Sequence, residues 1–138
     1  MKKSLCLILF MLFMFSSCTY GGNYGGKVSD VKTKKVDSKV YSQEDIASAI
    51  DTIKKDFERE WGGCTLTEIY YAGDEESADY QEWADRYNAD EVIVLLSSFD
   101  VDSSGGDGSL NSNSTYENWM WILVRTDGGK WKHVDHGY

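Results

Sequence analysis

Three apolar and aromatic runs in the second half of the chain have the length of β-strands, and turn-forming residues separate them. The runs span residues 92–99, 119–125 and 131–135 and are rich in β-branched and aromatic side chains. A loop of mostly Gly, Ser, Asn and Asp at 103–114 joins the first two runs, and Asp-Gly-Gly-Lys at 127–130 predicts a tight hairpin turn between the last two. This pattern predicts antiparallel strands.

An amphipathic helix is predicted before these strands. Ser42 and Asp45 resemble a capping box, which marks the start of a helix. The apolar residues that then recur at helical spacing are Ile46, Ile50, Ile53 and Phe57. We expect the helix to run from about residue 42 to 61 and to stop at Gly62-Gly63.

The remaining segments complete an α+β pattern. Residues 65–71 are β-branched and aromatic and predict a strand, and helical spacing returns over 74–88. The expected order is therefore helix, strand, helix, strand, strand, strand. This order predicts the α+β class, with a curved antiparallel sheet packed on helices.

The N-terminus has the pattern of an export signal. Met1-Lys2-Lys3 is positively charged, and residues 5–15 form an apolar run, shorter than the roughly 20 residues of a membrane-spanning helix. Ser16-Ser17-Cys18 follows and resembles the lipobox of bacterial lipoproteins. The resemblance implies that residues 1–17 are a signal peptide and that Cys18 carries lipid, on the extracytoplasmic face of the cell membrane. An ordinary cleaved signal with an unmodified Cys18 is the alternative.

The exported part is predicted to consist of a flexible tether over 18–40 and a domain over 41–138. The full chain has a net charge of −9; removal of 1–17 leaves 12 Lys and Arg against 23 Asp and Glu, or −11. We expect so acidic a domain to bind no nucleic acid and to reach the lipid bilayer through acylated Cys18. Cys64 would then be a lone thiol, and a small buried hydrophobe is favoured there over a reactive group.

The C-terminal hairpin carries a resemblance to a known superfamily. Residues 121–138 contain Gly128-Gly129-Lys130-Trp131-Lys132 and Asp135-His136-Gly137-Tyr138. With the element order, they look like the nuclear transport factor 2-like (cystatin-like cone) superfamily, and in particular its small lipoproteins from Gram-positive bacteria. The resemblance implies a cone-shaped fold over about 40–138. It leaves function open, because the superfamily includes isomerases, dehydratases and binding modules.

An acidic segment after the strand at 92–99 matches the first half of a calcium-binding loop. Its candidate ligands are Asp100, Asp102, Ser104 and Asp107. Gly105 fits the sharp turn of such loops, but Asn111 stands where a bidentate Glu is expected. The alternative is a solvated connection made of the residues that form turns.

Two other groups of side chains are candidates for a site. His133 and Asp135 would share one face of a strand, with His136 on the other, so the pair could act in acid–base catalysis; metal binding and a structural hydrogen bond are the alternatives. The possible ligand-lining aromatic residues are Tyr70, Trp119, Trp121 and Trp131. Plain core packing is the alternative for them.

The sequence favours a binding module over an enzyme. We expect the anchored domain to bind a small ligand or an envelope protein, without catalysis and without a cofactor other than calcium. The alternatives are a small hydrolase or isomerase that uses His133 and Asp135 in the cone cavity, and a structural module that calcium stabilises.

Overall fold

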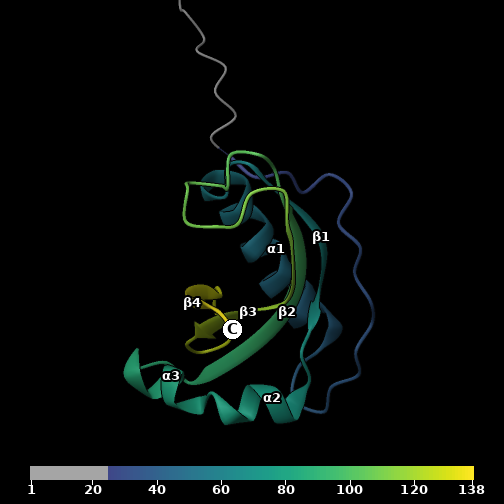
Figure 1. Cartoon of the computed structure of the whole chain (residues 1–138). Helices are drawn as coiled ribbons and strands as arrows, with labels where there is room; N and C mark the ends of the chain where they lie inside the picture. Colours follow the sequence, from purple (N-terminus) through teal and green to yellow (C-terminus); the bar gives the residue numbers. More distant parts are fainter. Residues whose placement is uncertain (1–24) are drawn as a thin grey trace, which may run out of the picture.

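A four-stranded antiparallel sheet forms the centre of the molecule (Figure 1). The computed structural model describes residues 25–138. The strands are β1 (Cys64–Tyr71), β2 (Glu91–Val101), β3 (Thr115–Arg125) and β4 (Lys132–Gly137). They lie in the order β1-β2-β3-β4, and each pairs antiparallel with its neighbour. The predicted α+β class with an antiparallel sheet is confirmed.

Helix α1 (Gln43–Glu60) packs against one face of the sheet. The predicted capping box is present: the Asp45 amide donates to the Ser42 hydroxyl, and the Ser42 amide donates to the Asp45 carboxylate. Ile53 and Phe57 are fully buried against the sheet. The helix ends before Gly62-Gly63, as predicted, and Gly63 has the positive φ of 78° that a residue with a side chain rarely adopts.

The prediction of one continuous helix over 74–88 is wrong. The chain forms two short helices, α2 (Asp74–Asp79) and α3 (Gln81–Arg86), so the element order differs from the expected one. They meet at Tyr80, whose amide donates to the Ser77 carbonyl three residues earlier. The Ser77 hydroxyl accepts from the Val94 amide of β2, which fixes α2 to the sheet at 3.0 Å.

Both faces of the sheet are apolar, because successive residues of β3 point to opposite faces and both sets are hydrophobic. Trp121 and Leu123 belong to the core cluster beneath α1, whereas Ile122 and Val124 belong to a second cluster that includes Ala84 of α3. Helix α1 therefore covers one face of the sheet, and α2 and α3 cover part of the other (Figure 1).

The described part of the predicted tether is not free of the domain. Residues 25–40 run along the outer side of β1 (Figure 1). The Lys27 and Lys32 amides each donate to a β1 carbonyl, that of Cys64 and that of Thr67, at 2.9 Å. The prediction of a flexible segment up to residue 40 is therefore wrong for 25–40. The sequence did not predict this contact, because the valines that pack on the core have no helical or strand period. They are Val28, Val31 and Val36.

The hairpin between β3 and β4 has the predicted turn. Asp127 and Gly128 both have positive φ, 53° and 64°, and the Gly129 amide donates to the Thr126 carbonyl. These values fit the type I′ turn that the Asp-Gly sequence predicts. In the part of the chain described here, no helix is long and apolar enough to cross a membrane.

Candidate functional site

A cavity of about 280 Å³ opens where α1 ends. It is lined by Glu60, Trp61, Gly62, Cys64, Gly106, Asp107, Ser109, Leu110, Trp119 and His136. The loop between β2 and β3 forms one wall. It is held there by the Asp102 amide, which donates to the Gly63 carbonyl at 2.9 Å, and a side chain on Gly63 would collide with Ser104.

Two indole rings, together with Cys64 and Leu110, form the apolar part of the cavity. The rings of Trp61 and Trp119 meet edge to face, with centroids 5.9 Å apart, and both contact Phe99. The Nε1 atom of Trp119 is buried and has no hydrogen-bond partner among the described residues. The cavity therefore has a rigid aromatic wall.

Carboxylates form the polar part of the cavity. Glu60 and Asp107 lie in its lining, and no Lys or Arg within 25–138 does. Hydrogen bonds from Ser109 to Asp107 hold the pKa of that carboxyl below its usual range. A neighbouring hollow of about 390 Å³ adds Asp102, whose pKa is likewise lowered by hydrogen bonds from Ser104. The two hollows together form an acidic surface around the indole rings.

The two histidines meet beside this cavity. His133 Nε2 and His136 Nδ1 are 3.2 Å apart, and His133 Nδ1 lies 3.3 Å from the Asp56 carboxylate of α1. Partial desolvation of its ring against Trp61 and Trp119, with the adjacent His133, lowers the pKa of His136, although the residue stays open to solvent. Asp135 is exposed.

The predicted division of these residues between two faces is wrong. A bulge in β4 sets Asp135 opposite Ile122 and His133 opposite Leu123, so Val134 is an extra residue. The bulge brings His133 and His136 together, and the carboxylate that His133 contacts belongs to Asp56 rather than Asp135.

The predicted calcium ligands are held by separate local contacts. The Asp100 carboxylate accepts from Thr115 Oγ1 at 2.7 Å, the Asp102 carboxylate from Ser104, and the Asp107 carboxylate from Ser109. Within 25–138 no three His, Cys, Asp or Glu side chains are grouped as metal ligands would be. The loop therefore presents its carboxylates singly.

Of the four predicted lining aromatics, the structure places Trp119 in the cavity. Trp121 is fully buried in the core, and buried Trp131 donates from Nε1 to the Asp45 carbonyl at 3.1 Å. Tyr70 lies elsewhere, with the Lys34 ammonium 3.8 Å from its ring centre. Cys64, 2% exposed, has the buried position that the sequence predicts, and burial raises its pKa to about 11.

Sequence reasoning missed two residues of this region. Trp61 was expected only to mark the end of the helix, and Asp56 was not among the candidate residues. Trp61 is the C-cap of α1. Its position next to Gly62-Gly63 was the available signal, because no further turn of the helix follows to cover the indole ring. Asp56 carried no comparable signal.

Comparisons with known proteins give no indication of function. No protein-family model, no curated protein and no solved structure matches the chain. The cavity and the histidine pair beside it therefore carry the functional argument.

Proposed function

We propose that this protein is an exported, lipid-anchored binding module whose cavity at the end of α1 holds a small organic cation. The observation that carries the proposal is the pairing of two indole rings, Trp61 and Trp119, with a lining whose charged side chains are carboxylates. The proposal keeps the expectation of a binding role without catalysis.

The cavity's chemistry favours a positive charge on an apolar body. A cation over an indole face is attracted by the ring's quadrupole, by about 0.5–2 kcal/mol. Glu60 and Asp107 add attraction from the rim, and the lowered pKa of His136 keeps its ring from opposing a cation. A volume of about 280 Å³ lies near the small end of ligand pockets, so the ligand would be small.

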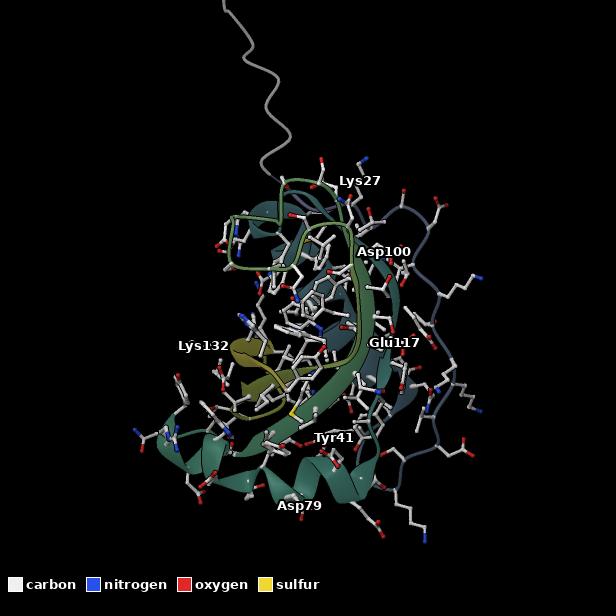
Figure 2. The ribbon with its side chains drawn as sticks, viewed as in Figure 1. Lys27, Tyr41, Asp79, Asp100, Glu117 and Lys132 are labelled. Atoms are coloured by element: carbon white, nitrogen blue, oxygen red, sulfur yellow. The ribbon has the colours of Figure 1, made fainter. Side chains whose placement is uncertain are left out.

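The anchor would place the cavity close to the bilayer. Cys18 precedes Gly25 by seven residues, which span at most about 25 Å when fully extended. The Gly26 amide donates to the Phe57 carbonyl near the end of α1, where the cavity opens. Lys27 and Asp100 lie at this end of the molecule and Asp79 at the other (Figure 2). A lipidated Cys18 would therefore hold the cavity at the membrane surface.

The nuclear transport factor 2-like fold is part of the proposal. An open antiparallel sheet with a long helix against one face and a C-terminal hairpin supports it. In such a cone the cavity at the end of α1 would correspond to the opening. An envelope protein that offers a Lys or Arg side chain would satisfy the same chemistry as a free cation.

A fluorescence titration of the full chain in detergent tests the binding role. The probe is benzyltrimethylammonium, and benzyl alcohol is its uncharged counterpart. We expect saturable quenching by the cation, at least tenfold weaker for Trp119→Leu and unchanged for Trp83→Leu, whose ring lies on α3 outside the cavity lining. Equal binding by Trp119→Leu, or no preference for the charged probe, would contradict the proposal.

Labelling with palmitate tests the anchor. In bacteria that express the chain, we expect label on the unaltered protein and none on Cys18→Ser. Label that persists in Cys18→Ser, or an unlabelled protein released to the medium, would contradict the lipid-anchored assignment.

A further inference from the structure

The only two histidines of the 138-residue sequence lie side by side, although they come from either side of a bulge in β4. Facing ring nitrogens, His133 Nε2 and His136 Nδ1, are 3.2 Å apart. Two nitrogens bound to one tetrahedral zinc ion at about 2.0–2.1 Å lie about 3.3 Å from each other. The spacing of the two rings is therefore that of two ligands of one ion.

We propose that His133 and His136 bind one divalent ion of the kind that prefers imidazole, with zinc as the representative. His133 would bind through Nε2 and His136 through Nδ1. Two protein ligands leave the remaining positions to water or to a molecule in the adjoining cavity, which His136 also lines. The cavity shares His136 with this pair, but the assignment rests on the spacing of the two histidine rings and not on the proposed cation binding.

Asp56 supports this assignment from the far side of His133. Its Oδ2 lies 3.3 Å from His133 Nδ1, and both side chains are mostly buried, at 17% and 14% exposure. A carboxylate behind a histidine fixes the ring tautomer and leaves the opposite nitrogen free to bind a metal. Asp56 also accepts a hydrogen bond from Arg59, which holds the carboxylate in place. Asp56 is thus a positioning residue.

The surroundings keep the pair oriented and accessible. The His133 ring packs against Trp121, and the His136 ring packs against Trp61 and Trp119. His136 is exposed, so an ion can reach it from solvent. Imidazole nitrogens suit zinc, copper and nickel, whereas calcium requires oxygen ligands. The carboxylates of the acidic loop therefore take no part in this assignment.

Calorimetric titration of the full chain, without an affinity tag and in detergent, tests the assignment. The titrant is zinc chloride in metal-free buffer. We expect one ion per chain, with affinity at least tenfold lower in His136→Ala and in His133→Ala. Asp56→Asn should weaken binding by about 10- to 100-fold. Asp135→Asn is the matched control, because this exposed carboxylate lies between the histidines in sequence and should leave affinity unchanged.

Ring-proton NMR of the unaltered chain tests the assignment without any variant, so misfolding of a variant cannot affect the result. The sequence has two histidines, so two sets of ring resonances should shift together as zinc is added, and calcium chloride should shift neither. Absence of saturable zinc binding, zinc binding that survives both histidine substitutions, or zinc binding that leaves the histidine resonances in place would overturn the proposal.

Discussion

Trp121 and Ser97 are joined by a hydrogen bond in the centre of the sheet, from the indole Nε1 to the hydroxyl Oγ at 2.7 Å. Both residues are at most 1% exposed. The same hydroxyl donates to the Trp119 carbonyl at 3.2 Å. Ser97 therefore satisfies the one polar atom of a buried tryptophan and ties β2 to the strand segment that carries the cavity wall.

Replacing this serine should destabilise the domain. Ser97→Ala leaves the Trp121 N–H buried without an acceptor, which costs about 1–3 kcal/mol. We expect urea unfolding to show that loss with an unchanged slope. Ser98→Ala is the matched control, since the next serine is only half-buried and its hydroxyl makes no hydrogen bond in the described structure. Equal stability of the two variants would contradict the role of Ser97.

The sequence predicted the elements whose signals are local. The Ser42–Asp45 capping box and the Asp127-Gly128 turn each depend on a few neighbouring residues, and both have the expected geometry. The break at Tyr80 escaped detection because Ser77 and Ala84, the buried residues of α2 and α3, are seven apart and keep the helical period across it.

The candidate site was less predictable because it depends on contacts between distant residues. Strict alternation along a strand would place His133 and His136 on opposite faces, and one bulge in β4 places them on the same side. Asp56 reaches His133 across 77 positions of sequence, which no pattern within α1 discloses. Trp119 was a candidate because aromatic residues on β3 stand out, but alternation alone did not separate it from Trp121 in the core.

The docking of the N-terminal segment gives a second prediction. A Cβ on Gly26 would lie 2.4 Å from Cδ1 of Phe57, so Gly26→Ala cannot pack without displacing the segment from α1. We expect faster hydrogen exchange at the Lys27 and Lys32 amides, which donate to β1. Ser29→Ala, at an exposed position of the same segment, should leave that exchange unchanged. Unaltered protection in Gly26→Ala would show that the segment tolerates a side chain there.

The ion pairs of Arg125 predict how stability depends on pH. Its guanidinium donates to Asp45 at 2.9 Å and pairs with Glu91, and the bond from Arg125 is the first cause that lowers the pKa of Asp45. A carboxyl whose folded pKa is depressed adds stability above its unfolded pKa, near 3.9, and loses it as pH falls through the folded value.

Asp45→Asn should therefore lower the free energy of unfolding at pH 7 by about 1 kcal/mol, which includes the weakened helix cap. The difference in unfolding free energy between Asp45→Asn and the unaltered chain should shrink as pH falls from about 5 to 2. Urea unfolding at each pH measures it. Asp51→Asn, an exposed partner of Lys55, is the control and should change stability by less than about 0.5 kcal/mol. Parallel pH curves for Asp45→Asn and the unaltered chain would exclude the Arg125 contact as the cause.

The Cys64 thiol should react slowly although it lines the cavity. Burial and the nearby Asp102 and Asp107 carboxylates raise its pKa to about 11, so the thiolate fraction at pH 8 falls roughly 100-fold below that of an ordinary thiol. We expect iodoacetamide to modify Cys64 about two orders of magnitude more slowly in the folded chain than in urea, as measured by mass spectrometry of the peptide that contains it. Similar rates in both conditions would mean that the cavity exposes an activated thiol, which would reopen the reactive role that its burial argues against.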